Sequence, residues 1–287
     1  MWIAESFAKI NLGLYVLERL PTGYHRIETG IAFIEWSDRF EVERSPEYAL
    51  TMSDDSIPAD ESNLITKAYR AFEKYIGLKN HYSFNVTKNI PAGAGLGGGS
   101  SNAALTFRML NKMEDVGLSN DEIVDLCRDL GMDIPLFVHG KPGMATDLGQ
   151  NIEPLDIQPN AWIVTVYPGF ESSTKEAYQN CMPNNEPDFS IKGVLVEEPI
   201  EEWQALLQND LEQSVIPRHE MIGNIKDQLL DFGAEYAAMS GSGSSVFGIF
   251  DQDFVAINAY ESFHKLGISA NLTRPGFTPD YGIYVKE

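Results

Sequence analysis

A glycine-rich segment, residues 91–104, is the part of the sequence best suited to do chemistry. It reads PAGAGLGGGSSNAA, and five of the seven residues from 93 to 99 are glycine. Glycine inside a helix costs about 1 kcal/mol per residue, so the cluster predicts a loop. Its bare N–H groups can wrap an anion, and a helix expected to begin at Ser100 would point its free amides at the same place. We therefore predict a phosphate-binding loop, with a flexible hinge as the alternative.

Two other glycine-rich phosphate motifs fit this segment less well. The P-loop pattern GxxxxGK[ST] is absent, because the single Gly-Lys pair, at 140–141, is followed by proline. The dinucleotide pattern GxGxxG is met formally at Gly93, Gly95 and Gly98. Pro91, however, stands where the preceding strand should end. A nicotinamide-dependent oxidoreductase and a non-enzymatic nucleotide-binding module are the alternatives that these patterns leave open.

Two charged residues, Lys9 and Asp133, are candidates for a functional site. Lys9 lies in a largely apolar segment that is expected to be a strand, where an unpaired ammonium would be costly. Asn11, two residues on, lies on the same face of that strand. Asp133 follows a helix that begins at the capping box formed by Ser119 and Glu122. We expect Lys9 to face a polar site and Asp133 to lie in a loop.

The charge balance argues against several classes of partner. The chain has 21 Lys and Arg against 42 Asp and Glu, a net charge of −21, and such a field repels DNA and RNA. Two cysteines exclude a disulfide framework and a cysteine-based zinc site. The sequence shows no signal peptide and no apolar run near the ~18 residues that cross a bilayer. We expect a cytoplasmic protein that binds neither nucleic acid nor membrane and meets phosphates with local positive groups.

The elements that position these residues follow from periodicity and turn signals. Strands are expected at 10–16, 31–42, 82–86, 162–167, 246–250 and 281–286. Helices are expected at 62–77, 100–113, 119–131, 201–209, 218–232 and 253–266. Residues 150–160 predict a domain boundary, and the proline-rich, acidic stretch 183–200 predicts a mobile surface segment. Because strands and helices mix without a strict βαβ repeat, we predict an α+β fold with domains at 1–155 and 156–287.

Four sequence motifs together resemble a known enzyme family. Residues 91–104 resemble the second motif of the galactokinase, homoserine kinase, mevalonate kinase and phosphomevalonate kinase (GHMP) superfamily. Residues 8–12 with Gly23-Tyr24-His25 resemble the first motif of one branch, and 239–247 resemble the third motif. With Leu130–Pro135, the motifs occur in family order and span residues 8–247.

The resemblance implies both a fold and a reaction. The fold would be a two-domain α+β structure with the active site in the cleft between the domains. The branch phosphorylates 4-diphosphocytidyl-2-C-methyl-D-erythritol on its 2-hydroxyl. ATP would be the co-substrate, and Mg²⁺ would bind together with ATP. The product would be an intermediate of the non-mevalonate isoprenoid precursor pathway, and the partner a small molecule with a cytidine diphosphate group. Another superfamily kinase, of the homoserine or mevalonate type, is the alternative.

The same resemblance places the roles on particular residues. Lys9 and Asp133 match the catalytic pair, in which the carboxylate orients the acceptor hydroxyl and takes its proton. The ATP-binding positions are Asn63, Leu64, Lys88, Pro91, Ala92, Gly93, Ala94, Gly95, Leu96, Gly97, Gly98, Gly99, Ser100 and Ser101. The substrate-binding positions are Asn11, Tyr24, His25, Thr174 and Tyr178. The alternative is that these residues have purely structural roles: surface lysines, a helix-capping asparagine, a loop aspartate that bonds local amides, and core aromatic residues.

Overall fold

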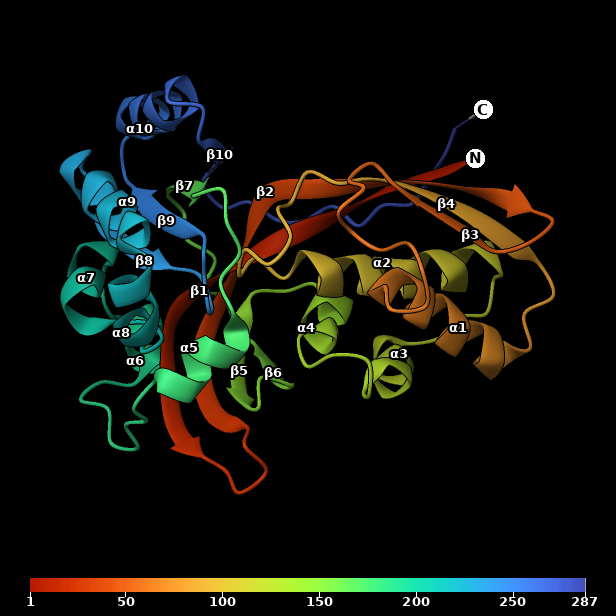
Figure 1. Cartoon of the computed structure of the whole chain (residues 1–287), viewed down its shortest axis with the longest axis horizontal. Coiled ribbons are helices and arrows are strands. Elements are labelled where there is room, and N and C mark those ends of the chain that lie inside the picture. Colours follow the sequence, from red (N-terminus) through yellow and green to blue (C-terminus); the bar gives the residue numbers. More distant parts are fainter. Residues whose placement is uncertain (287) are drawn as a thin grey trace.

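Two β-sheets with helices packed against them form the framework of the computed structural model, which describes residues 1–286 (Figure 1). The first sheet contains β1 (Trp2–Arg19), β2 (His25–Ser45), β3 (Ala49–Met52), β4 (His81–Thr87), β5 (Gly143–Asp147), β6 (Asn151–Pro154) and β11 (Tyr284–Val285). The second has the order β10 (Ser269–Thr273), β7 (Trp162–Tyr167), β9 (Val246–Phe250) and β8 (Tyr236–Met239). Neighbouring strands are antiparallel except β3 and β4. The α+β prediction is confirmed.

The helices divide between the two sheets in the same order as the chain (Figure 1). The first group is α1 (Leu64–Ile76), α2 (Gly98–Met113), α3 (Asn120–Cys127) and α4 (Ile134–His139). The second is α5 (Thr174–Asn180), α6 (Ile191–Glu197), α7 (Trp203–Leu206), α8 (Glu212–Val215), α9 (Glu220–Asp231) and α10 (Asp253–Lys265), with 3₁₀ turns at Ile200–Glu202 and Ile216–Arg218. Among residues 1–286, no helix has the length and apolarity needed to span a membrane.

The β1–β2 hairpin links the two halves of the molecule. Its strands, of 18 and 21 residues, run through the first sheet and continue past the second group of helices (Figure 1). Helix α2 packs on β1 from one half, and α6 and β8 contact it from the other. A strand covered on both faces has an almost continuous buried run rather than an alternating one. For this reason Lys9 and Asn11, in the middle of β1, are only 5% and 4% exposed.

Most predicted elements are present, but several boundaries differ. Helix α2 begins at Gly98, two residues before the predicted start, and α3 ends at Cys127, well before Gly131. The prediction of a mobile segment over 183–200 is wrong for its second half, because Ile191 and Leu195 of α6 are buried against the hairpin. The last strand is only Tyr284–Val285, and it pairs with β1 in the first sheet.

Candidate active site

The glycine-rich loop needs its glycines for backbone geometry and for space. Gly93, Gly95 and Gly97 have φ of 59°, 77° and 70°, in the left-handed region that favours glycine. A Cβ on Gly95 would lie 2.1 Å from the carbonyl oxygen of Ser240, and one on Gly97 would lie 2.6 Å from the Phe137 ring. The loop therefore passes between two packed walls that exclude any side chain.

The loop ends at the N-terminus of α2, which presents free donors. The first helical hydrogen bond runs from the Ser101 amide to the Gly97 carbonyl, at 2.9 Å. The amides of Gly98, Gly99 and Ser100 thus have no partner within the helix, and Gly97 at the N-cap supplies no side-chain bond. Ser101, which the family resemblance places among the ATP-binding positions, is buried, and its hydroxyl donates to the Phe7 carbonyl at 2.7 Å.

A cavity of about 390 Å³ opens on this side of the loop, and we call it the glycine-loop cavity. Its lining is Met52, Ile57, Pro58, Ser62, Asn63, Leu64, Lys88, the run Pro91–Ser100 and Asn102. One end is therefore apolar and the other consists of backbone amides, which suits a flat base joined to phosphates. Asn63 also caps α1, since its side chain accepts from the Ile65 amide at 2.9 Å.

Lys88 lines this cavity, but its charge is already paired. Its Nζ lies 2.6 Å from Asp38 Oδ2, and both side chains are almost fully buried. It also donates to the Ile90 carbonyl. Asp38 Oδ1 accepts the amides of Asn89 and Ile90, each at 2.8 Å. The pair therefore fixes the chain that enters the glycine loop. Asp38 was not singled out from the sequence, because its partner lies 50 residues away.

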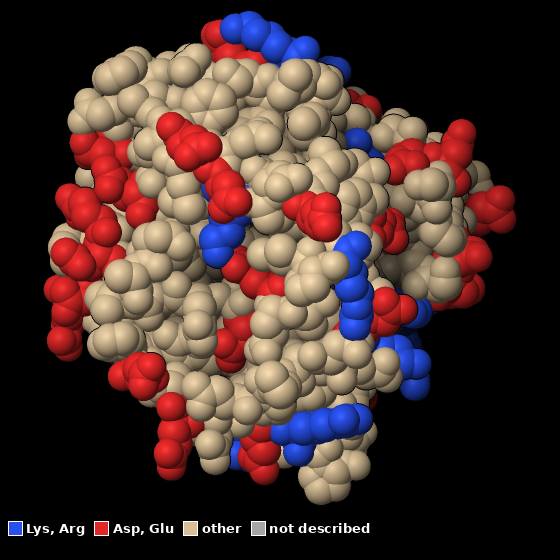
Figure 2. Space-filling view, turned by 60° about the vertical axis from the view of Figure 1, so that its left-hand side comes forward, with Lys and Arg blue, Asp and Glu red and all other residues tan. Residues whose placement is uncertain are grey.

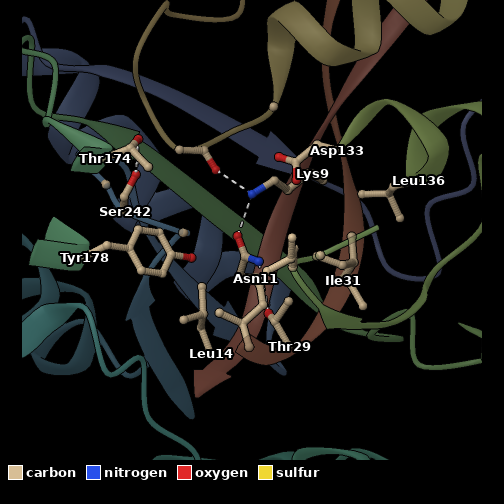
Figure 3. A pocket seen from close by; sticks show the side chains of 18 of the residues that line it. Lys9, Asn11, Leu14, Thr29, Ile31, Asp133, Leu136, Thr174, Tyr178 and Ser242 are labelled. Carbon is tan, nitrogen blue, oxygen red and sulfur yellow. Dashed lines mark hydrogen bonds between the residues drawn. The ribbon is translucent and has the colours of Figure 1, made fainter. Parts of the chain in front are cut away.

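A second cavity, of about 230 Å³, lies on the other side of the loop and contains Lys9 (Figure 3). Lys9 Nζ donates to Asn11 Oδ1 at 2.6 Å and to the Gly95 carbonyl at 2.9 Å. Asn11 in turn donates to the Thr29 hydroxyl at 3.0 Å. Burial lowers the pKa of Lys9, while the charge of Asp133 acts in the opposite direction. We call this space the Lys9 cavity; the glycine loop separates it from the first.

Asp133 lines the Lys9 cavity and stands just before α4 (Figure 3). It occupies the N-cap position of α4, yet its side chain makes no capping hydrogen bond. That geometry disfavours the alternative of a loop aspartate held by local amides. A carboxylate at the surface of a cavity, with an ammonium nearby, is placed to accept a proton from a bound hydroxyl.

The loop Ser240–Ser245 closes the Lys9 cavity from the second half of the chain. The Ser240 hydroxyl donates to the Gly95 carbonyl at 3.0 Å, and the Ser245 amide donates to the Ala94 carbonyl at 3.0 Å. Buried Asn209 holds this loop, because its Nδ2 donates to the carbonyls of Met239 and Gly241 at 2.7 and 2.8 Å. Asn209 lies in a short loop before α8, and no pattern in the sequence marks it.

A third cavity, of about 590 Å³, adjoins the second; we call it the Tyr24 cavity. Its lining is Arg19, Thr22, Gly23, Tyr24, His25, Met132, Leu148, Thr174, Lys175, Tyr178 and Gln179. Tyr24 is 57% exposed and free to contact a ligand. Tyr178 stacks on His25, with centroids 5.2 Å apart and an interplanar angle of 29°. Burial, followed by the charge of Arg19, lowers the pKa of His25, so the imidazole is neutral at pH 7.

The second and third cavities share one wall. Leu148, Thr174 and Tyr178 line both of them. The Thr174 hydroxyl is 2.8 Å from that of Ser242, which joins α5 to the Ser240–Ser245 loop. The predicted substrate-binding residues therefore line these two adjacent cavities, and the predicted catalytic residues line the Lys9 cavity.

Metal ligands are sparse in this region. Among residues 1–286, no group of three or more His, Cys, Asp or Glu side chains could hold an ion. Within the described part of the chain, Asp133 is the one carboxylate that lines the Lys9 cavity. These residues fit a magnesium ion that is coordinated chiefly by phosphate oxygens and water, as is usual for that ion.

Comparisons with known proteins agree with this geometry. Family models for the GHMP kinases N-terminal domain and the GHMP kinases C-terminal region match residues 63–141 and 192–269. A 4-diphosphocytidyl-2-C-methyl-D-erythritol kinase of Chlorobium phaeobacteroides (strain BS1) is 37% identical, covering 96% of this chain and 97% of the relative. One of Cytophaga hutchinsonii is 42% identical over 90% of this chain and 93% of the relative.

Solved structures give the same result. A crystal structure of a 4-(cytidine 5′-diphospho)-2C-methyl-D-erythritol kinase has a TM-score of 0.81 and 28% identity, over 94% of this chain and 98% of that one. The Methanococcus jannaschii mevalonate kinase shares the fold, with a TM-score of 0.74 and 16% identity over 96% and 98%. The chain belongs to the GHMP kinases, and within them to the 4-diphosphocytidyl-2-C-methyl-D-erythritol kinase family.

Proposed function

We propose that this kinase transfers the γ-phosphoryl group of ATP to the 2-hydroxyl of 4-diphosphocytidyl-2-C-methyl-D-erythritol. One observation carries the proposal: the Lys9 cavity shares Gly93, Gly95 and Gly97 with the glycine-loop cavity and shares Tyr178 with the Tyr24 cavity. A triphosphate on one side and a base-linked alcohol on the other would meet there, beside Asp133.

We assign the nucleotide to the glycine-loop cavity. The apolar wall with Ile57 and Leu64 receives the adenine ring, and the amides of Gly98, Gly99 and Ser100 bind phosphate oxygens. Backbone amides bind anions without adding net charge, so this site works within an acidic chain. Magnesium, when bound to the phosphates, offsets their charge.

We assign the reaction to Asp133 and Lys9. The acceptor oxygen forms a bond to the γ-phosphorus as the bond from that phosphorus to the β,γ-bridging oxygen breaks, and ADP leaves. The proton of the acceptor hydroxyl passes to the carboxylate of Asp133. The Lys9 ammonium, held by Asn11 and the Gly95 carbonyl, stabilises negative charge on the transferring group.

We assign the cytidine to the Tyr24 cavity. A pyrimidine can stack on the exposed Tyr24 ring, and the neutral imidazole of His25 can bond its edge. Homoserine and mevalonate have no base to fill this cavity, so the alternative superfamily substrates leave it without a role.

The test is a coupled assay of ADP formation with each acceptor in turn. We expect turnover with 4-diphosphocytidyl-2-C-methyl-D-erythritol and a background rate with homoserine and mevalonate. A phosphate on the 2-oxygen of the product should be visible by ³¹P NMR. Turnover of homoserine or mevalonate without turnover of the cytidyl substrate would refute the proposal.

A further inference from the structure

The charge lining the Tyr24 cavity contrasts with that of the whole chain. Arg19 and Lys175 line this cavity, and among residues 1–286 no aspartate or glutamate does. The chain as a whole has a net charge of −21, and acidic side chains are spread widely over the face in Figure 2. A cavity with two cations and no carboxylate is therefore a local positive region in a negative field, and it favours an anionic ligand.

Neither cation is neutralised by a neighbour in the part of the chain that the structure describes. Arg19 is next to Glu18, but the carboxylate of Glu18 is bound by Arg26 at 2.8 Å. Arg19 pairs in strand register with His25, and its charge helps to lower the pKa of that imidazole. Its field therefore acts inside the Tyr24 cavity. Lys175 is exposed in the first turn of α5 and forms no ion pair with the residues that the structure describes.

The position of Lys175 matches the middle of a ligand that spans the Lys9 and Tyr24 cavities, and Arg19 lies beside His25, its partner in strand register. A base in the Tyr24 cavity and a hydroxyl beside Asp133 must be joined past the shared wall of Leu148, Thr174 and Tyr178. Lys175 directly follows Thr174 on that wall. In the proposed substrate, the group that joins the base-bearing part to the acceptor alcohol is a diphosphate.

We propose that Arg19 and Lys175 bind the diphosphate linker of the acceptor substrate. The inference rests on the proposed function and deepens it, because it makes the enzyme specific for a nucleoside diphosphate-linked alcohol rather than for any alcohol with a pyrimidine attached. The two side chains act in binding and have no part in the phosphoryl transfer itself.

Kinetics of three variants test the inference. Arg19→Gln and Lys175→Gln should each raise KM for the cytidyl substrate about 5-fold, the scale of an exposed charge pair, and the double variant about 25-fold. The kcat and the KM for ATP should not change, which also reports correct folding. Lys192→Gln is the matched control: it makes the same change of net charge, but Lys192 pairs with Glu153 at 2.6 Å and lies outside the cavity.

Calorimetric binding separates this inference from the proposed function. Wild-type protein should bind CDP more tightly than cytidine, and the double variant should lose most of that preference while its affinity for cytidine stays the same. An unchanged preference in the double variant overturns the inference even though the enzyme still phosphorylates the cytidyl substrate. A wild-type protein that neither binds CDP nor uses the cytidyl substrate overturns the proposed function, and the inference with it.

Discussion

The buried pair of Lys88 and Asp38 allows a sharp test of how the glycine loop is held. The two charges are 2.6 Å apart, with side-chain exposures of 6% and 0%. The same carboxylate binds the amides of Asn89 and Ile90, directly before the loop begins. A Cβ on Gly98 would lie 3.1 Å from Lys88 Nζ, so the ammonium lies close to the N-terminus of α2. Removing the charge of Asp38 should affect both stability and nucleotide binding.

The change we consider is Asp38→Asn, which keeps the shape and one oxygen for the backbone amides. It leaves the Lys88 ammonium buried without its partner, a loss of about 3–5 kcal/mol in the free energy of unfolding. At roughly 2 °C per kcal/mol, Tm should fall by about 6–10 °C. Lys88→Met should cost less, because Asp38 keeps its two amide bonds. The double variant should be more stable than Asp38→Asn alone.

The stability lost in Asp38→Asn should depend on pH, in a direction that follows from the pKa of Lys88. Burial lowers the pKa of Lys88 from 10.5, and Asp38 acts to raise it. Without Asp38 the folded-state pKa falls further below its unfolded value, so the folded protein binds the proton less well than the unfolded chain. The loss in the free energy of unfolding is then complete at pH values below the folded-state pKa of Lys88. It becomes smaller as pH rises toward the unfolded-state pKa of that residue.

Thermal unfolding of the wild-type protein and of both single variants at pH 7 and pH 9.5 checks this reasoning. The Tm of Asp38→Asn should be closer to the wild-type Tm at pH 9.5 than at pH 7. The Tm of Lys88→Met, which lacks the titrating group, should show no such recovery. An Asp38→Asn protein as stable as wild type at pH 7, or a deficit that grows with pH, would refute the account. The KM for ATP should also rise in Asp38→Asn, because the chain entering the loop is released.

Three further variants test other parts of the site. Asp133→Asn should lower kcat by a factor of about 10² or more with little change in the KM for ATP, and a retained kcat would exclude its role as proton acceptor. Tyr24→Ala should raise KM for the cytidyl substrate by about 5- to 100-fold, the worth of one stacked base, whereas an unchanged KM would exclude stacking on this ring. Asn209→Asp should lower Tm and kcat together, because the carbonyls of Met239 and Gly241 lose their buried donors at about 1–3 kcal/mol each; a wild-type kcat would show that the loop is held by other contacts.

Local signals in the sequence predicted the local parts of the site. The glycine cluster identified a loop followed by a helix, and the capping box at Ser119 and Glu122 is present with both of its bonds. The start of α2 was misplaced by two residues, since Gly97 can hold the left-handed N-cap conformation that leads into the helix. That property of glycine depends on its neighbours in space, and composition alone does not reveal it.

Residues that act through distant partners could not be found in this way. Asp38 lies 50 residues from Lys88, and Asn209 lies 30 residues from the carbonyl of Met239. Neither residue is marked by its sequence neighbours, because its partners come close to it only in the folded chain. The proximity of Lys9 and Asp133 likewise followed from the family resemblance and not from their spacing. Helix α6 was missed because seven residues are too few to establish a helical period amid prolines and acids.

The glycine-loop cavity and the Tyr24 cavity meet phosphate charge by different physical means, and this difference should appear in how the KM of each ligand responds to salt. Backbone amides at the start of α2 bear no net charge, and the nearby Lys88 is neutralised by Asp38. In contrast, Arg19 and Lys175 are exposed and form no ion pair within residues 1–286, so salt screens them efficiently. Raising ionic strength should therefore increase KM for the cytidyl substrate more steeply than KM for ATP. If both KM values depended equally on ionic strength, exposed cations would bind both ligands, which would contradict this assignment.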